Sequence, residues 1–333
     1  MTDNTVLRVD SLWVDYYTRS GPIRVVQDVS FEIRRGEILG LAGESGSGKS
    51  TVAQAVTRLI RPTVGRMGGD VWLQDENIAQ LDRKALRHIK WKKVSIVAQS
   101  AMNSLNPVLR IRSQFDDILQ SHGQRNRQKN FARMCELIEM VSLSAEVLDA
   151  FPHQLSGGMK QRVAIAMALL FHPDLVIMDE PTTALDVIVE REIVSEIKRL
   201  QRQFGFSVLF ISHDLDLLLR MADRVAIMYG GYLMEIGSVQ EFAHPLHPYS
   251  RALLQSFPAI GAVGAERRRG IPGYPPDPAN PPGGCRFHPR CSHSSERCGS
   301  DLPVWEAVEG AGDQRVRCIR WREIPNESHT GSD

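Results

Sequence analysis

Hydrophobic residues fall into short runs along the first 98 positions of the chain, and turn residues separate these runs. Residues 6–17, 29–33 and 37–42 alternate or cluster apolar side chains in the manner of strands. The third run leads into a glycine-rich loop, after which the pattern predicts a helix over 50–60. The N-terminal third is therefore expected to supply strands and one loop-to-helix transition.

Helical spacing replaces this pattern between residues 81 and 170. Apolar residues recur there at intervals of three and four, most clearly over 111–122 and 130–141, which predicts amphipathic helices. Further along, 175–178 and 208–211 are continuous apolar runs. Runs of this kind are typical of strands buried on both faces of a parallel sheet.

The segment between those two runs, residues 187–204, predicts the crossover helix of a strand–helix–strand unit. Residues 224–235 predict a hairpin turning at Gly230-Gly231. Beyond about residue 243 the composition changes, and six of the 18 prolines lie between positions 271 and 282. This stretch is expected to be a stiff linker, and the polar residues 326–333 are expected to be disordered.

Composition and charge then narrow the class of protein. The 333 residues carry 40 Lys and Arg against 39 Asp and Glu, a formal net charge of +1, which argues against a protein that coats nucleic acid. No apolar run approaches the length of about 20 residues that is needed to span a bilayer. Residues 1–10 are polar and acidic and do not resemble a signal peptide. We expect a cytosolic protein that acts at a membrane only through partners.

The glycine-rich loop fits the pattern G-x-x-x-x-G-K-[ST] and stands between a predicted strand and a predicted helix. Backbone N–H groups of such a loop point inward around phosphates, the lysine reaches the β and γ phosphates, and the last hydroxyl binds Mg²⁺. This predicts an ATP-type phosphate site at Gly43, Glu44, Ser45, Gly46, Ser47, Gly48, Lys49, Ser50 and Thr51.

Two later segments carry the rest of the chemistry. The apolar strand over 175–178 ends in Asp179 and Glu180, which are placed to hold Mg²⁺ and to polarise an attacking water. Leu155-Ser156-Gly157-Gly158 precedes a strongly apolar helix. The serine hydroxyl, the glycine N–H groups and the helix N-terminus predict a second anion site there.

With Leu-Ser-Gly-Gly, Asp-Glu-Pro-Thr and then Ala184-Leu185-Asp186, the chain over about residues 5–240 resembles the nucleotide-binding subunit of an ABC transporter. The resemblance implies that Tyr16 stacks on adenine and that Gln99 contacts Mg²⁺ and water. It implies that Asp186 crosses a dimer interface and that His213 grips the γ-phosphate. It also implies that Ser156 completes the ATP site of a second subunit, so that the chain acts as half of a head-to-tail dimer.

The segment His247-Pro248-Tyr249 and the later Ile-Pro-Gly-x-Pro-Pro and Cys-Arg-Phe-x-Pro-Arg-Cys motifs resemble the C-terminal extension of ATP-binding subunits of peptide, opine and nickel importers. The implied function is ATP hydrolysis that energises uptake of oligopeptides or dipeptides. Nickel complexes and oligosaccharides are variants of the same subfamily. The implied partners are two transmembrane permease subunits, a second ATP-binding subunit and an extracytoplasmic solute-binding protein, with the chain at the cytoplasmic face of the inner membrane.

Four of the five cysteines lie in the last fifth of the chain, namely Cys285, Cys291, Cys298 and Cys318. In a chain without an export signal such clustering favours a metal site over disulfides. Intervals of five, six and nineteen residues lack the tight pairs of structural zinc sites, whereas a [4Fe–4S] cluster needs only convergent thiolates. Some relatives with this tail carry such a cluster, and zinc or unliganded thiols remain alternatives.

The fold expected overall is an α/β P-loop ABC ATPase, with a mixed sheet, an antiparallel β subdomain and a helical subdomain, followed by a small irregular metal-binding extension. The expected boundaries are 5–242 for the ATPase, with its helical subdomain at about 100–165, then 243–284 for the linker and 285–325 for the extension. A soluble ABC-type ATPase acting on nucleic acid is the alternative class. Only about 105 residues separate Lys49 from Ser156, which leaves no room for the long insertions of that class.

Overall fold

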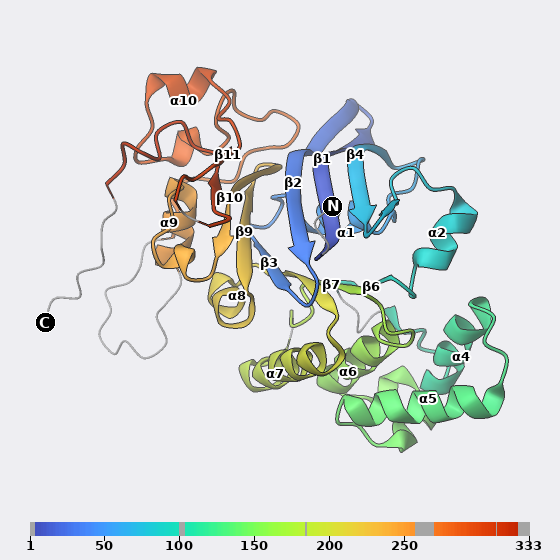
Figure 1. Ribbon diagram of the computed structural model, residues 1–333. Coiled ribbons are helices and arrows are strands. Elements are labelled where there is room, and N and C mark those ends of the chain that lie inside the picture. Colours follow the sequence, from blue (N-terminus) through green and yellow to red (C-terminus); the bar gives the residue numbers. More distant parts are fainter. Residues whose placement is uncertain (1–3, 100–103, 184, 257–269, 311, 326–333) are drawn as a thin grey trace, which may run out of the picture. The chain divides into compact units, whose positions relative to one another are not determined.

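The computed structural model describes residues 4–99, 104–183, 185–256, 270–310 and 312–325, which fold into two compact units (Figure 1). Unit 1 comprises Met1–Arg8, Glu32–Glu37 and Trp72–Ile211. Unit 2 comprises Val9–Phe31, Ile38–Val71 and Ser212–Asp333. Within the described residues, no helix is both long and apolar enough to cross a membrane.

Unit 1 contains a parallel sheet of three strands flanked by helices. Val94 of β6 stands opposite Leu175 of β7, and Leu175 stands opposite Ser207 of β8. Strands β7 and β8 are buried along their whole length, as their continuous apolar sequences predict. The elements are β5 (Glu76–Asn77), α2 (Arg83–Ile89), β6 (Val94–Val97), α4 (Ile111–Ser121), α5 (Arg127–Met140), α6 (Gly157–Ala168), β7 (Leu175–Asp179), α7 (Val187–Phe204) and β8 (Ser207–Ile211), with 3₁₀ turns at Ala145–Asp149 and Pro152–Gln154.

Unit 2 contains a second set of strands, in which β3 pairs in parallel with β9 and β9 pairs antiparallel with β10. The described residues 270–325 are called the tail below. Its strand β12 pairs with β10, and β11 pairs with β12. The elements are β3 (Ile38–Ala42), α1 (Lys49–Val56), α8 (Leu215–Met221), β9 (Arg224–Tyr229), β10 (Tyr232–Ser238), α9 (Pro248–Ser256), α10 (Glu296–Ser300), β11 (Glu306–Ala307) and β12 (Arg315–Val316), with 3₁₀ turns at Glu241–Ala243 and His288–Arg290.

Strands β1 (Thr5–Thr18), β2 (Gly21–Arg34) and β4 (Gly65–Leu73) lie side by side in the order β2-β1-β4, and the larger part of each belongs to unit 2. Asp15 on β1 is 3% exposed and accepts hydrogen bonds from Arg24 and Arg66. These two guanidinium groups lower the pKa of the carboxyl below its usual range, the bond from Arg24 being the largest contribution. An ion network thus links the three strands.

Several predicted elements are confirmed and three are corrected. The crossover helix is α7, which begins after Asp186 and ends at Gly205 with φ of 70°. The strand predicted at 29–33 is the end of the longer β2, because polar side chains on its other face concealed the first half. A strand, β6, interrupts the stretch predicted as helical. Helix α1 ends at Val56 rather than near Ile60, because the Thr57 hydroxyl donates to the Ala53 carbonyl and Arg58 has φ of 52°.

The C-terminal segment is more ordered than the predicted irregular extension. Glu235 on β10 stands opposite Val316 on β12, so the tail extends the β9–β10 hairpin by two further strands. Val316, Cys318 and Ile324 form a small buried cluster against which Leu246 and Trp321 pack. Backbone pairing and burial of apolar side chains both attach the tail to unit 2.

Candidate functional site

The phosphate loop connects β3 to α1 within unit 2. Gly43 has φ of 148°, and a Cβ atom at this position would lie 2.1 Å from the Met228 carbonyl oxygen. Only glycine therefore allows the loop to leave β3 in this direction. Gly46 has φ of 78°, and a Cβ atom there would meet nothing within 4 Å, so the turn faces open space. Glycines with positive φ at both positions allow the turned backbone of a phosphate-binding loop.

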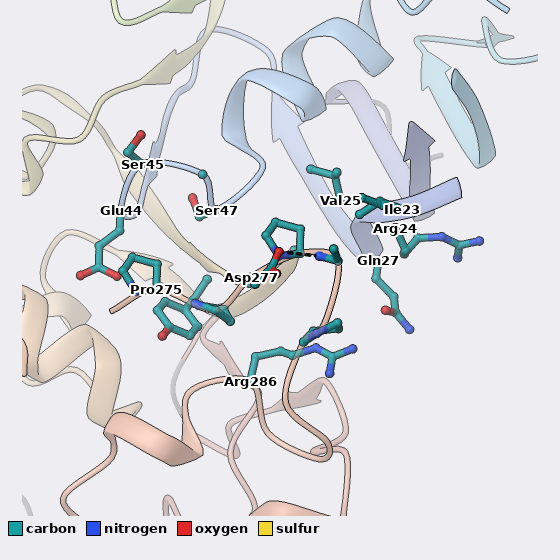
Figure 2. A pocket seen from close by; sticks show the side chains of 18 of the residues that line it. Ile23, Arg24, Val25, Gln27, Glu44, Ser45, Ser47, Pro275, Asp277 and Arg286 are labelled. Carbon is teal, nitrogen blue, oxygen red and sulfur yellow. Dashed lines mark hydrogen bonds between the residues drawn. The ribbon is translucent and has the colours of Figure 1, made fainter. Parts of the chain in front are cut away.

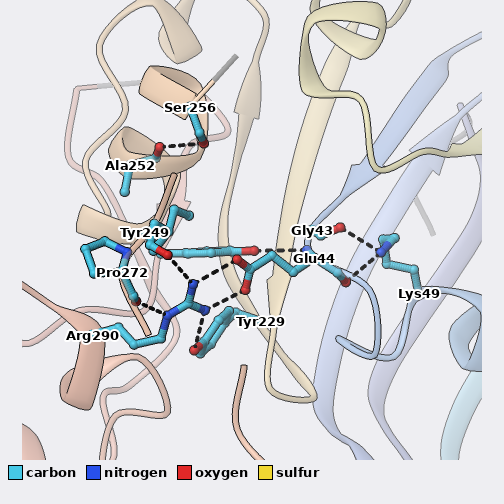
Figure 3. A network of polar contacts seen from close by, with 10 residues as sticks. Gly43, Glu44, Lys49, Tyr229, Tyr249, Ala252, Ser256, Pro272 and Arg290 are labelled. Carbon is cyan, nitrogen blue, oxygen red and sulfur yellow. Dashed lines mark hydrogen bonds and ion pairs between the residues drawn. The ribbon is translucent and has the colours of Figure 1, made fainter. Parts of the chain in front are cut away.

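Lys49, the first residue of α1, is 5% exposed, and its ammonium group lies within the loop. Lys49 Nζ donates to the Gly43 carbonyl oxygen at 2.7 Å and to the Glu44 carbonyl oxygen at 2.9 Å (Figure 3). Ser50 and Thr51 follow in the first turn and are half-buried. Lys49, Ser50 and Thr51 thus place one cation and two hydroxyls at the start of one helix, where proteins commonly bind phosphate groups.

Tyr16 lies on β1 and is half-buried, whereas the neighbouring Tyr17 is 50% exposed. The Tyr16 hydroxyl donates to Gln54 Oε1 at 3.2 Å, which connects β1 with α1. His213 is exposed and stands immediately before Asp214, the residue whose side chain caps α8. Unit 2 thus contains the phosphate loop, the aromatic residue and the histidine of the predicted ATP site.

The predicted carboxylates lie at the end of β7 in unit 1. Asp179 is 5% exposed, and Glu180 follows in a left-handed conformation with φ of 48°. Glu180 Oε2 accepts hydrogen bonds from Gln99 Nε2 at 3.1 Å and from Thr183 Oγ1 at 2.9 Å. A strained backbone at a carboxylate held by an amide and a hydroxyl is typical of functional sites.

Ser156, Gly157 and Gly158 begin helix α6, and Ser156 Oγ accepts a hydrogen bond from Met159 N–H at 3.2 Å. Asp186 begins α7, and its Oδ1 accepts from Val189 N–H at 3.0 Å. A Cβ atom on Gly158 would lie 2.8 Å from Val189 Cγ1, so the starts of the two helices pack closely. Unit 1 brings the Ser156 motif beside the Asp186 helix.

The predicted ATP-site residues are therefore divided between the two units. Unit 2 holds Tyr16, the phosphate loop and His213, whereas unit 1 holds Gln99, Asp179, Glu180, the Ser156 motif and Asp186. Ala184, which belongs to one of the motifs, lies outside the described residues. The oxygens offered by Ser50, Asp179 and Gln99 are the donor type that Mg²⁺ prefers, so these residues fit that cation chemically.

A pocket beside the phosphate loop in unit 2 has one wall that the sequence did not predict (Figure 2). Arg24 and Val25 of β2 line one side, and the loop lines another. The proline-rich segment, predicted to be a linker, supplies Pro275 and Asp277, and Arg286 of the tail lies nearby. Local sequence gives no signal for this role, since it depends on how the tail folds back.

All four tail cysteines line one small cavity of unit 2, together with His288 and His293. Cys285, Cys298 and Cys318 are buried, and the N–H of Cys285 donates to the Cys298 carbonyl at 2.9 Å. Burial raises the pKa of the Cys285 thiol to about 11 and that of Cys318 to about 12. Convergence of four thiols fits a thiolate-bound group in residue type. However, among the residues that the structure describes, no three His, Cys, Asp or Glu side chains form a group that could hold a metal ion.

Two segments of the chain match two different families of known proteins. Residues 26–183 match the family described as ABC transporter, and residues 234–298 match the one described as oligopeptide/dipeptide transporter, C-terminal region. A dipeptide transport ATP-binding protein, DppD, of Caldanaerobacter subterraneus subsp. tengcongensis is 39% identical over 96% of this chain and 98% of its own. The chain belongs to the ABC transporter family. It is an ATP-binding subunit of that family, with a C-terminal region of the oligopeptide/dipeptide type.

Two further relatives support this membership of the ABC family. The oligopeptide transport ATP-binding protein OppD of Salmonella typhimurium is 39% identical over 90% of each chain. The solved dimeric structure of the ATP-binding cassette MJ0796 with ADP and Pi is 28% identical, with a TM-score of 0.62, and covers 70% of this chain and 98% of its own.

Proposed function

We propose that this ABC subunit hydrolyses ATP to energise the uptake of oligopeptides or dipeptides across the cytoplasmic membrane. The observation that carries the proposal is the full-length similarity to a dipeptide transport ATP-binding protein, which includes the tail. The phosphate loop, which turns at the positive-φ glycines Gly43 and Gly46 and holds the Lys49 ammonium, supports ATP as the nucleotide.

The chemistry follows from the groups in each unit. Lys49 and the loop N–H groups bind the phosphates, Tyr16 stacks on adenine, and Ser50, Asp179 and Gln99 hold Mg²⁺. Glu180 polarises the attacking water while Gln99 and Thr183 orient its carboxylate. His213 contacts the γ-phosphate. Mg²⁺, when bound, neutralises charge that develops on the transferred phosphoryl group.

We further propose that the subunit works in a dimer with a second, paralogous ATP-binding subunit. Ser156, Gly157 and Gly158 would contact the nucleotide on the other subunit, and Asp186 would cross the interface. The exposed side chains of Ser156 and Asp186 and the adjacent helix starts support this assignment. Two permeases and a solute-binding protein complete the complex, which places the chain at the cytoplasmic face of the inner membrane, without nucleic acid.

For the domains we propose 5–242 as the ATPase, with a helical subdomain at about 100–165, then 243–284 and 285–325 as linker and extension. We propose that Cys285, Cys291, Cys298 and Cys318 hold a [4Fe–4S] cluster, with zinc as the alternative. All four line one cavity and three of them are buried, which supports this proposal. Such a cluster would fasten a segment too small for a core of its own.

Iron, sulfide and zinc content of the anaerobically purified chain tests the cluster. We expect four iron and four sulfide per chain, with absorbance near 400 nm, in the [4Fe–4S] stoichiometry. Cys298→Ser should lose the iron. Cys135→Ser is the matched control, because Cys135 lies on α5 outside the tail and should retain it. Equimolar zinc without iron would refute the iron–sulfur cluster and show that the cysteines bind zinc instead.

Transport by the assembled complex tests the function. Proteoliposomes containing the permeases and both ATP-binding subunits should take up labelled di- and oligopeptides only with ATP, and Lys49→Ala should abolish uptake. Nickel complexes and oligosaccharides serve as competing cargo. Uptake of either one with no uptake of peptides would refute the peptide assignment, and ATP hydrolysis stimulated only by nucleic acid would refute the transport function.

A further inference from the structure

The C-terminal tail binds the phosphate loop directly through Arg290. This residue ends the 3₁₀ turn His288–Arg290, and its side chain is only 6% exposed. Arg290 Nη1 donates to Glu44 Oε2 at 2.6 Å, and Nη2 donates to Glu44 Oε1 at 3.0 Å (Figure 3). The pair is a bidentate guanidinium–carboxylate contact between residues 246 positions apart.

The guanidinium itself is fixed by further bonds. Nε donates to the Pro272 carbonyl at 2.7 Å, Nη2 also donates to the Ile271 carbonyl at 3.1 Å, and Nη1 donates to the Tyr229 hydroxyl at 3.1 Å. With the two bonds to Glu44, the five N–H donors of an arginine have five acceptors. The tail therefore presents a rigid cation to the loop.

Glu44 is held at its backbone as well as at its carboxylate. Its N–H donates to the Tyr249 hydroxyl at 3.0 Å, and its carbonyl accepts from Lys49 Nζ at 2.9 Å. Tyr249 is fully buried in α9 and packs its ring against Tyr229, with centroids 4.5 Å apart. Displacement of Glu44 would therefore also shift the carbonyl that orients the Lys49 ammonium.

Charge gives this contact a consequence for the nucleotide. Glu44 is the second residue of a loop built to surround phosphates, so an uncompensated carboxylate there would repel the ligand. The Arg290 guanidinium neutralises that carboxylate and holds it on the side of the tail. Ser45 and Gly46, at the tip of the loop, are exposed and have no comparable tether from the described part of the tail.

We propose that Arg290 is a positioning residue for the phosphate loop, through which the C-terminal tail sets the affinity of the subunit for ATP. The proposal rests on the proposed function, because it concerns the same nucleotide site. It assigns the tail a part in nucleotide binding in addition to any cluster that it holds. The mechanism is neutralisation and orientation of Glu44 rather than contact with the nucleotide.

Nucleotide affinity of the purified full chain is the test, measured by titration with a fluorescent ATP analogue. Arg290→Gln removes the charge and the fork, and we expect the Kd to rise about tenfold or more. Arg290→Lys keeps the charge but not the bidentate geometry, and a rise of about threefold is expected. Glu44→Gln combined with Arg290→Gln removes the unpaired carboxylate and should return the Kd to within about threefold of the wild type.

Arg317→Gln is the matched control, because Arg317 is another buried tail arginine. The Arg317 side chain is 4% exposed and pairs with Asp28 at 2.8 Å. Asp28 does not belong to the phosphate loop. This variant should lower the unfolding temperature measured without nucleotide and leave the Kd unchanged. In the assembled ATPase, Arg290→Gln should raise the KM for ATP and keep kcat within about twofold.

The outcomes separate the two proposals. A wild-type chain that binds no ATP would refute the proposed function. A wild type that binds ATP, with Arg290→Gln equal to it or with no rescue by Glu44→Gln, would refute the role of Arg290 alone. If Arg290→Gln does not fold, the test uses Arg290→Lys. An unchanged Kd of Arg290→Lys would likewise refute the role of Arg290.

Discussion

The phosphate loop of unit 2 and the Ser156–Asp186 region of unit 1 are held in place by different means. Ser156 and Asp186 accept hydrogen bonds from N–H groups three residues ahead, so their conformation is set by their own neighbours. Glu44 is held by Arg290 and Tyr249, which are 246 and 205 residues away. A local cap forms as soon as its helix forms, whereas a distant tether exists only after the tail has folded onto unit 2.

The two regions should therefore respond differently to mutation. Removing a local cap should weaken one helix end, whereas removing a distant tether should loosen a loop whose backbone has few other side-chain bonds. Glu180 combines the two kinds of support, because Gln99 is 81 residues away and Thr183 only three.

Glu180→Gln should give the largest effect. In the proposed mechanism this carboxylate activates the attacking water, so steady-state ATP hydrolysis of the complex should fall about 100-fold or more, while ATP binding persists. Gln99→Ala and Thr183→Ala each remove one partner of the Glu180 carboxylate, and loss of the distant partner Gln99 should reduce the rate more than loss of Thr183. Normal hydrolysis by Glu180→Gln would remove Glu180 from the proposed mechanism.

Gly158→Ala should introduce a clash, because the new Cβ atom would lie 2.8 Å from Val189 Cγ1. Overpacking of this kind costs about 2 kcal/mol of unfolding free energy, measured by urea denaturation. Combining it with Val189→Ala reopens the space and should recover most of the loss. Equal stability of Gly158→Ala and wild type would mean that the helix starts of α6 and α7 separate easily.

Asp15→Asn tests the ion network of Asp15, Arg24 and Arg66 in unit 2. It should lower the free energy of unfolding by about 1.5 kcal/mol, because two charge-assisted hydrogen bonds become weaker. Arg24 and Arg66 lower the pKa of Asp15, so the native state favours the carboxylate. The stability from this group is therefore present above its ordinary pKa of 3.8 and is lost as the pH falls through the lower native value. Thermal unfolding between pH 6 and 3 should show the difference from Asp15→Asn narrowing at the acid end. A difference that widens with acidification would contradict the assigned pKa direction.

Asp186→Ala should have the smallest effect on stability, because it removes one local cap, about 1 kcal/mol. Asp186→Asn is the matched control, since asparagine caps helices as well as aspartate does. Thermal unfolding should separate the two variants. Loss of ATP hydrolysis in both, with stability retained in Asp186→Asn, would indicate the dimer role and not the cap.

The elements that the sequence predicts correctly are those whose signals are local. The predicted crossover helix coincides with α7, because Asp186 and Gly205 mark its two ends. The apolar runs became β7 and β8, because continuous hydrophobicity demands burial on both faces. The sequence does not predict the first half of β2, whose exposed face is polar, or β4, which contains three glycines. It also does not predict β6, a strand of four residues within a stretch of helical spacing.

Local sequence patterns specify the chemical groups of this protein: a phosphate loop, a strand ending in two carboxylates, and a tail rich in proline and cysteine. These depend on neighbours along the chain, whose spacing fixes helix caps, turns and buried strands. Three features arise only in the folded chain: Arg290 neutralises Glu44, Tyr249 binds the Glu44 N–H, and the proline-rich segment lines a pocket. Contacts between residues over 200 positions apart leave no periodicity in the sequence, because they arise from folding of the tail onto the strands and loop of unit 2.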